Sequence, residues 1–340
     1  MEYTALRQLA SVKDWLGETR IGRDAAGNPT DITDHKGRTV SYEWGSMGER
    51  KSITYPDGNK AIYEYDEMLR LQKVCIRRNE GMAGASRESD DIEEIRYKYN
   101  ETGRISEKLF PEGMRTRWLY DESGRLAELV HEDRHGVLDR YQYEYDFMGN
   151  KTAITKDRRG LREESGRYEY GYDALSRLTC VSKDGRALRS YVYDSFGNRS
   201  YLEDYEKGRN TFYVYDVLNR LVLMEEGYSN NTLADENLGI AGAALLEELT
   251  RTVYTYDNRG NLIREETGGQ LVYDYEYGAM NRLTGLWNNK GQEIHYWYNG
   301  LGQRTGKNVN GDEEDYLLDL TRNYHNLLDI QIGERATLLF

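Results

Sequence analysis

The sequence is built on one short motif that returns about every 21 residues, and this periodicity restricts the chain to a repeat architecture. The clearest copy is Tyr191–Arg199, which reads Tyr-Val-Tyr-Asp-Ser-Phe-Gly-Asn-Arg. Fourteen units align with this copy, and the two weakest begin at Met1 and Ile21. The other units start at Tyr42, Tyr63, Tyr97, Trp118, Tyr143, Tyr170, Tyr191, Tyr213, Tyr254, Tyr275, Tyr296 and Tyr316. In such arrays each repeat contacts its neighbours, so we expect one array without a domain boundary.

Each unit predicts a β-hairpin. Alternate side chains of a strand share a face, so Tyr191 and Tyr193 point the same way and Val192 points the other way. The fourth position carries a turn-forming Asp or Asn, whose side chain can bond the backbone two residues further on. These residues are Asp24, Asp66, Asn100, Asp121, Asp146, Asp173, Asp194, Asp216, Asp257, Asn299 and Asp319. The seventh position is usually Gly, or Asn at Asn219 and Asn281, which is typical of a positive φ.

The composition narrows the class of protein. Charged residues make up 31% of the chain, above the usual ~25%, so we expect a thin core and a sheet with two partly wet faces. The net charge of -13 argues against a nucleic-acid partner, because phosphates are bound by clustered cations. No apolar run is long enough for a membrane span, and the first residues do not resemble a signal peptide. Cys75 and Cys180 are too few for a disulfide framework, and their redox state stays open.

Two insertions interrupt the period, at residues 77–93 and 228–250. The first lacks alternation and is rich in Gly, Ser, Asp and Glu, which is typical of a mobile loop. The second contains Leu238–Leu249, whose Ala and Leu content predicts the chain's one helix. Units then resume through Tyr316, and residues 324–340 leave the pattern as a truncated C-terminal segment.

Three motifs could carry chemistry, and each has a simpler interpretation. His131-Glu132-Asp133-Arg134-His135 matches the zinc-protease pattern His-Glu-x-x-His, which requires a helix. Here it follows a strand and runs into a turn, so we expect no zinc. Gly300-x-Gly302 has the wrong spacing for a dinucleotide fingerprint, and each turn aspartate is alone in its unit, unlike the ligands of a calcium loop. We therefore expect no catalytic, cofactor-binding or metal-binding residue and no enzyme activity.

The pattern Tyr-x-Tyr-Asp-x-x-Gly-Arg-Leu resembles the YD repeats of the bacterial RHS family, as in Trp118–Leu126 and Tyr254–Leu262. The resemblance covers essentially the whole chain, and the terminal Tyr316–Arg322 with Tyr324–Leu328 also resembles RHS shells. It implies a β-ribbon spiralled into a hollow shell, related to the cocoon of insecticidal toxin complexes and to the YD shell of teneurins. It also implies a secreted or cell-surface protein, in some members associated with the cell wall, that carries a variable C-terminal toxin used in competition between bacteria.

The expected fold is therefore all-β: a YD-repeat hairpin array over residues 1–323 that forms a curved, partly open spiral sheet. The alternative is a seven-bladed propeller, since two 21-residue hairpins make one four-stranded blade. No Asp-Pro-x-Gly-Leu self-cleavage motif or toxin domain is present, so we expect a shell segment that contacts flanking shell or toxin segments of a longer protein. The functional alternative is a carbohydrate-binding adhesin, because exposed tyrosines can stack on surface glycans.

Overall fold

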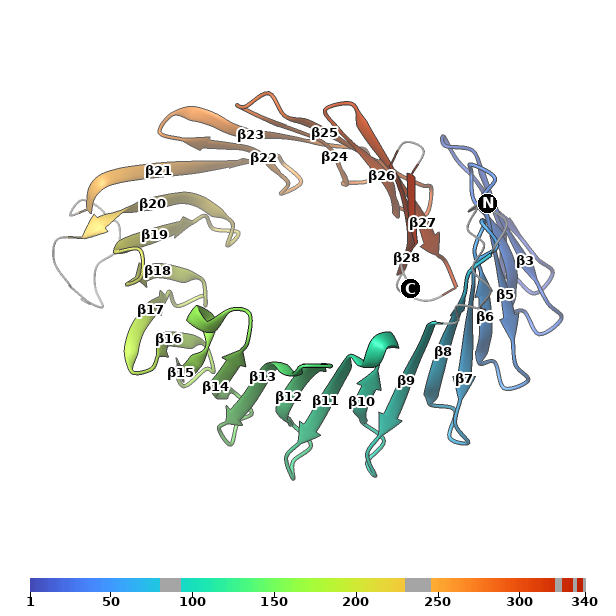
Figure 1. The fold of residues 1–340 in the computed structure, drawn as a ribbon. Helices are drawn as coiled ribbons and strands as arrows, with labels where there is room; N and C mark the ends of the chain where they lie inside the picture. The colour runs from blue at the N-terminus through green and yellow to red at the C-terminus, as the bar shows by residue number, and fades with distance from the viewer. Residues whose placement is uncertain (80–92, 230–245, 322–325, 333–334, 339–340) are drawn as a thin grey trace. The chain divides into compact units, whose positions relative to one another are not determined.

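The structure is a computed structural model, and it describes residues 1–79, 93–229, 246–321, 326–332 and 335–338. Within these ranges the chain forms 29 β-strands and two single-turn 3-10 helices (Figure 1). The expected fold class, an all-β array of hairpins, is confirmed. No helix among the described residues is both long and apolar enough to cross a lipid bilayer.

The strands follow one another at short intervals along the chain. The first ten, with one 3-10 helix, are β1 (Glu2–Tyr3), β2 (Leu9–Lys13), β3 (Glu18–Arg23), β4 (Pro29–Thr33), β5 (Thr39–Trp44), β6 (Arg50–Thr54), β7 (Lys60–Tyr65), β8 (Leu71–Arg77), β9 (Glu93–Tyr99), β10 (Ile105–Leu109) and η2 (Pro111–Gly113). The next are β11 (Arg115–Tyr120), β12 (Leu126–Asp133), β13 (Gly136–Tyr145), β14 (Lys151–Arg158), η3 (Arg162–Glu164), β15 (Gly166–Tyr172), β16 (Leu178–Lys183), β17 (Arg186–Tyr193), β18 (Arg199–Asp204), β19 (Arg209–Tyr215) and β20 (Leu221–Ser229). The last are β21 (Leu246–Tyr256), β22 (Leu262–Thr267), β23 (Gln270–Tyr277), β24 (Leu283–Asn288), β25 (Glu293–Tyr298), β26 (Arg304–Val309), β27 (Asp312–Asp319), β28 (Asn326–Ile332) and β29 (Arg335–Leu338).

The turn inside each repeat forms as the residues at its fourth and seventh positions predict. In the Tyr191 unit, Asp194 Oδ1 accepts hydrogen bonds from the backbone N–H of Phe196 at 2.9 Å and of Asn198 at 2.8 Å. Gly197 takes a φ of 88°, a conformation in which a β-carbon is strained. The expected capping role is confirmed in all eleven units with Asp or Asn at the fourth position.

Two details of the hairpin were not predicted. The seventh position also has a positive φ where it is Leu69 (58°) or Ser176 (60°), so the turn keeps its shape without Gly or Asn. In addition, the strand register shifts beside the second aromatic residue of the motif, as between Val192 and Tyr193. Such a β-bulge adds one residue to one strand, and the same shift recurs in the other YD hairpins whose register is described.

Seven hairpins are attached to the preceding one through the second tyrosine of their motif. Leu178 lies just after the turn of the previous unit, and its backbone carbonyl accepts a hydrogen bond from the Tyr193 hydroxyl at 2.8 Å. Six other tyrosines make the same contact at 2.7–3.0 Å: Tyr65, Tyr99, Tyr145, Tyr172, Tyr215 and Tyr256. Trp44 replaces the hydroxyl with its indole N–H, which donates to the carbonyl of Pro29.

An arginine at the eighth position strengthens this attachment in four units. Arg177 Nε donates to Asp173 of its own turn at 2.6 Å, and its guanidinium carbon lies 4.8 Å from the ring centre of Tyr193 in the next unit. The same arrangement recurs at Arg70, Arg125 and Arg220. The turn, the arginine and the next tyrosine therefore form one contact that joins neighbouring hairpins.

The described residues divide into two compact units. Unit 1 comprises Met1–Arg115, Gly278–Gly285 and Glu293–Phe340, and unit 2 comprises Thr116–Tyr277 and Leu286–Gln292. Inside unit 1, strands β1 to β10 and β25 to β29 each pair antiparallel with the next strand in sequence. Inside unit 2, β12 to β23 pair in the same way.

This pairing contradicts the propeller alternative. A propeller divides its strands into separate four-stranded blades, whereas the twelve strands β12 to β23 form one unbroken run. Within this run the second tyrosine binds the preceding hairpin at five successive junctions, so none of these junctions is the boundary of a blade.

The helix expected at Leu238–Leu249 is wrong for the part that the structure describes. Leu246–Leu249 belongs to β21, and the ladder of β20 with β21 reaches Ser229 opposite Leu246. The hydrogen bonds of a neighbouring strand outweigh the local helix propensity of these residues. The rest of the expected helix and residues 80–92 of the first insertion lie outside the described ranges. Residues 326–332 and 335–338 form β28 and β29, which continue the pairing from β27.

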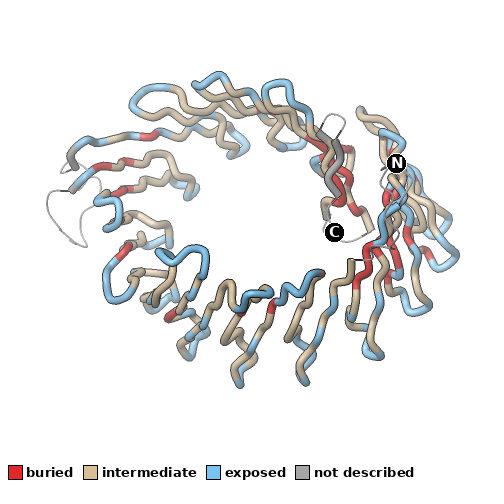
Figure 2. The backbone as a smooth tube through the Cα atoms, viewed as in Figure 1, coloured by how far each residue is buried: buried red, intermediate tan, exposed pale blue. Residues whose placement is uncertain are grey.

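Most of the buried apolar side chains belong to unit 1. Figure 2 shows the buried positions on the N-terminal strands β4 to β8 and on β27 and β28, whereas unit 2 has few. In unit 2 most strand positions are partly exposed, as expected for a sheet with two partly wet faces.

Candidate functional site: the contact between the first and last repeats

Strands β4 to β7 of unit 1 carry a second layer, formed by the C-terminal strands β27 and β28. We call this contact the seam. Its apolar part contains the buried residues Ile32, Val40, Tyr42, Ile53, Tyr55, Ala61, Leu317 and Leu328. Ile21, Trp44, Tyr63 and Leu320 pack around them. Large apolar side chains buried from both layers stabilise such a contact by about 1.5–3 kcal/mol each, relative to exposure.

A buried ion pair lies beside this apolar cluster. Arg50 on β6 and Asp319 at the end of β27 are 2.7 Å apart, with side chains only 5% and 1% exposed. The second oxygen of Asp319 accepts from the Tyr42 hydroxyl at 3.3 Å and from the Thr321 hydroxyl at 2.6 Å. The guanidinium of Arg50 also lies over the rings of Tyr42 and Trp44, at 5.3 and 5.5 Å. Both charges are therefore paired and hydrogen-bonded, as burial requires.

The protonation states follow from these contacts. Burial alone would raise the pKa of Asp319, but the hydrogen bonds from Thr321 and the charge of Arg50 outweigh it and hold this pKa below its usual value. Burial and the neighbouring charge of Asp319 raise the pKa of the Tyr42 hydroxyl far above its usual value. At neutral pH the seam therefore holds a carboxylate, a guanidinium and a neutral phenol.

Further polar contacts lie at the margin of the seam. Lys36 and Asp315 form an ion pair, and Arg38 donates to the backbone carbonyl of Tyr316 at 3.1 Å. The backbone N–H of Gly300, in the turn of the Tyr296 unit, donates to Asp14. These contacts set the register of the C-terminal layer on the N-terminal one.

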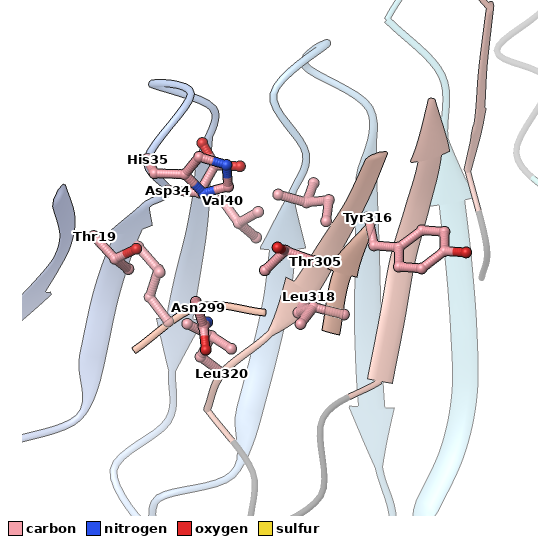
Figure 3. A pocket seen from close by; sticks show the side chains of 11 residues that line it. Thr19, Asp34, His35, Val40, Asn299, Thr305, Tyr316, Leu318 and Leu320 are labelled. Atoms are coloured by element: carbon pink, nitrogen blue, oxygen red, sulfur yellow. The ribbon is translucent and has the colours of Figure 1, made fainter. Parts of the chain in front are cut away.

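The seam encloses a cavity of about 20 Å³ (Figure 3). Thr19, His35 and Val40 line it from the N-terminal strands, and Thr305 and Leu318 line it from β26 and β27. A space of this size holds about one water molecule and is too small for an organic substrate. The geometry of the seam is that of a packed structural contact.

The zinc-protease pattern does not form the geometry that zinc needs. His131 lies on β12, where its Nδ1 is 2.9 Å from the Thr116 hydroxyl, and His135 lies in the following turn. Glu132 is paired with Arg117 at 2.6 Å. The expected strand and turn are confirmed at this motif. Among the described residues, no three His, Cys, Asp or Glu side chains gather as a metal site would require.

Sequence reasoning missed the seam. Asp319 was expected only to cap a turn, which it does by accepting from the backbone N–H of Thr321 at 3.0 Å, but its other oxygen holds Arg50. The ninth repeat position is leucine in several units, as at Leu71, but it is also a cation at Lys151, Arg199 and Arg304, so no sequence signal singles out Arg50.

The fold and its repeated contacts define a structural β-hairpin array of the YD type. The sequence model of the teneurin YD-shell family matches residues 137–306, which is half of the chain, and the RHS repeat model matches residues 23–60. The chain therefore belongs to the teneurin YD-shell family, and the resemblance to RHS repeats is confirmed.

Comparisons with individual proteins agree with this assignment to the family. Double-stranded DNA deaminase toxin A of Burkholderia cenocepacia (strain H111) is 28% identical over 163 residues, which are 48% of this chain and 10% of that protein. The crystal structure of TcdB2-TccC3 matches 97% of this chain with a TM-score of 0.59 at 16% identity. The Photorhabdus luminescens Tc holotoxin pore matches 94% of it with a TM-score of 0.55 at 12% identity. The chain spans 18% of each of these two solved chains, and the likeness shows the fold alone.

Proposed function

We propose that this chain is a non-enzymatic shell segment of a longer RHS-type protein, and that the shell encloses or presents a C-terminal toxin in competition between bacteria. The observation that carries the proposal is the repeated contact between one hairpin and the hairpin before it, which eight units make through the second aromatic residue of the motif. Seven tyrosine hydroxyls and four arginines make contacts between neighbouring repeats, which is what a continuous wall requires.

The relatives support the role of the longer protein. The curated relative is a toxin, and the matched part is a tenth of its length, which leaves room for a separate toxin segment in that protein. One of the two solved relatives is a holotoxin by name, and its TccC3 component is also named in the other structure. A structural role for the shared fold is consistent with each of them.

The proposal includes partners and a location. The partners are flanking shell or toxin segments, and the location is outside the producing cell or on its surface. The net charge of -13 argues against a nucleic-acid partner for the chain itself. The glycan-binding alternative is weakened where an arginine of the preceding unit covers the ring on which a sugar would stack. This happens at four second tyrosines: Tyr99, Tyr145, Tyr193 and Tyr256.

The test uses the natural coding sequence that continues this chain. The downstream segment is expressed once attached to the chain and once attached to an unrelated soluble carrier. If the chain helps to enclose the segment, protease digests the attached segment at least about tenfold more slowly than the carrier fusion. Equal digestion rates would show that the chain does not shield it.

A second measurement addresses competition. Deleting the codons for residues 137–306 from a producing strain removes the family-matched repeats, and we expect loss of killing of a sensitive neighbour strain. The control strain carries Leu69→Asn in the same gene, which keeps a residue suited to a positive φ in that turn. Full killing by the deletion strain would contradict the proposal.

A further inference from the structure

At one end of its strands, unit 2 has a row of hairpin turns that all come from the repeat motif. We call this end of the strands an edge of the unit. Because consecutive strands run antiparallel, the turns that join β13 to β14, β15 to β16, β17 to β18 and β19 to β20 lie at the same edge. These turns are residues 146–149, 173–176, 194–197 and 216–219. Figure 2 shows the outer residues of these turns as exposed.

These four turns present large apolar side chains directly to solvent. The exposed fractions are 95% for Phe147, 66% for Met148, 73% for Leu175, 79% for Phe196, 99% for Val217 and 68% for Leu218. We call these six residues the apolar edge. A soluble surface seldom carries so many fully exposed apolar groups side by side, and such patches mark interaction sites.

The turn itself does not need apolar residues. The same turn forms at Asp121–Gly124 with Glu and Ser in the middle, and at Asp257–Gly260 with Asn and Arg. Gly124 and Gly149 donate to the aspartate carbonyl of their turns at 2.9 and 3.2 Å and have φ values of 76° and 89°. Since the backbone is alike with either kind of side chain, the apolar residues have another purpose.

The apolar edge is also bounded. The two polar turns just described are the motif turns before and after it in unit 2, so the patch has a polar rim at both ends. The opposite edge of the same strands ends in polar groups, such as Asp184–Gly185 and Glu206–Lys207. An apolar centre with a polar rim is the composition of a protein interface.

We infer that the apolar edge is the contact surface for a second copy of this chain. Hairpins repeat every ~10 Å across a sheet, so four tips form a row of ~30 Å with gaps that side chains of an identical row can fill. Six side chains of this size present on the order of 800 Å², which is what each partner contributes to a standard interface. Two such rows related by a twofold axis are self-complementary.

The charges at the edge favour this partner over a lipid surface. Each tip begins with an aspartate, and the whole chain has a net charge of -13, which disfavours anionic lipids. In the tips, Asp173 and Asp216 are paired with Arg177 and Arg220 at 2.6 and 2.7 Å. In the other two tips, Asp146 and Asp194 accept hydrogen bonds from the side-chain amides of Asn150 and Asn198, so these two tips keep a negative charge beside the apolar residues.

Sedimentation velocity on the full chain tests the inference. We expect the unaltered chain to be mostly dimeric at tens of micromolar, with little dependence on salt because the contact is apolar. A tip variant with Phe147→Glu, Phe196→Ser and Val217→Asn uses residue types like those of the polar turns. Its dimer dissociation constant should rise by at least about tenfold.

The control variant carries Met47→Ser and Met68→Ser, two apolar residues that are each 73% exposed in motif turns of unit 1. It should dimerise like the unaltered chain, and all three proteins should share one circular dichroism spectrum. An unaltered chain that stays monomeric, or a tip variant that stays dimeric, would overturn the inference. A monomer that floats with neutral phosphatidylcholine vesicles would instead assign the edge to lipid.

Discussion

Arg50 shows how one residue can give a repeat a role that its neighbours lack. Its repeat position is leucine in several other units and arginine at Arg199 and Arg304, whose guanidinium groups lie over tyrosine rings of their own units. At Arg50 the position faces the C-terminal layer and binds Asp319, while the rings of Tyr42 and Trp44 cover the guanidinium. The pair fixes which part of the C-terminal segment contacts the N-terminal repeats, because no other register joins the two charges.

Arg50→Met should therefore destabilise the seam by about 3–5 kcal/mol, since Asp319 is left charged and buried without a partner. Hydrogen exchange of the β5 and β6 amides measures the loss. The double variant Arg50→Met with Asp319→Leu should recover most of it. The control, Arg125→Met, breaks the part-exposed pair with Asp121 and should cost less than about 1 kcal/mol. If Arg50→Met loses no more stability than this control, the buried pair is not important for the seam.

The seam should also loosen in acid. The pKa of Asp319 is lower in the folded chain than in the unfolded chain, so the contribution of Asp319 is complete above the unfolded value of about 3.9. The contribution is lost as pH falls through the lower folded value. Trp44 fluorescence between pH 7 and pH 2 should report the change below about pH 4. In Asp319→Asn this change in fluorescence should be missing. If the variant shows the same change, it is caused by the titration of other groups.

The seventh position of the motif allows a paired test of backbone strain. Leu69 has a φ of 58°, where a leucine side chain costs about 1–2 kcal/mol, so Leu69→Asn should raise the melting temperature. Gly197 has a φ of 88° and no atom within 4 Å of an added β-carbon, so Gly197→Ala should lower it through strain alone. Equal melting temperatures for both variants would show that the turn relaxes to accept either residue.

At the scale of the hairpin, the second tyrosine of the motif has two separate functions. Its ring receives the arginine of the previous unit, and its hydroxyl binds the backbone of that unit, as Tyr193 does with Arg177 and Leu178. Neighbouring strands would pair without these contacts, but the contacts make each hairpin depend on the one before it.

Tyr193→Phe should therefore cost about 1 kcal/mol by removing the hydrogen bond to Leu178 while keeping the ring. Tyr193→Leu should cost more, because the contact with Arg177 is also lost. Chemical denaturation monitored by far-ultraviolet circular dichroism gives both values. If both variants lose the same free energy of unfolding, the contact of the ring with Arg177 contributes nothing to stability.

The hairpins were predictable because their signals are local. Asp194 and Gly197 lie within one turn and act on the backbone of that turn, so the sequence is sufficient to place them. The β-bulge beside Tyr193 was not predictable, because its register depends on the partner strand. The helix expected near Leu246 failed for the same reason, since pairing with β20 decides its conformation. The seam joins repeats far apart in the chain, and periodicity does not say which repeats meet.

At the scale of the whole molecule, the two units differ in how they bury apolar surface. The apolar cluster of unit 1 lies between two layers, whereas unit 2 buries only Val130, Ala153, Leu188 and Phe212 among its described apolar residues. Amides of β5, β6 and β27 should therefore exchange more slowly than those of β15 to β18. Exchange measured by mass spectrometry on the intact chain gives the comparison. Equal protection would show that the hairpin contacts alone stabilise the array.

The 269 residues that separate Arg50 from Asp319 have a consequence for synthesis. At about 5–20 residues per second, the ribosome reaches Asp319 roughly 15–50 seconds after it has made Arg50. During this time β4 to β7 can form while the face that the last strands will cover stays open, with Ile53 and Tyr55 unprotected. A chaperone that binds nascent apolar surface would find its site on these strands, and it must leave before the last repeats arrive.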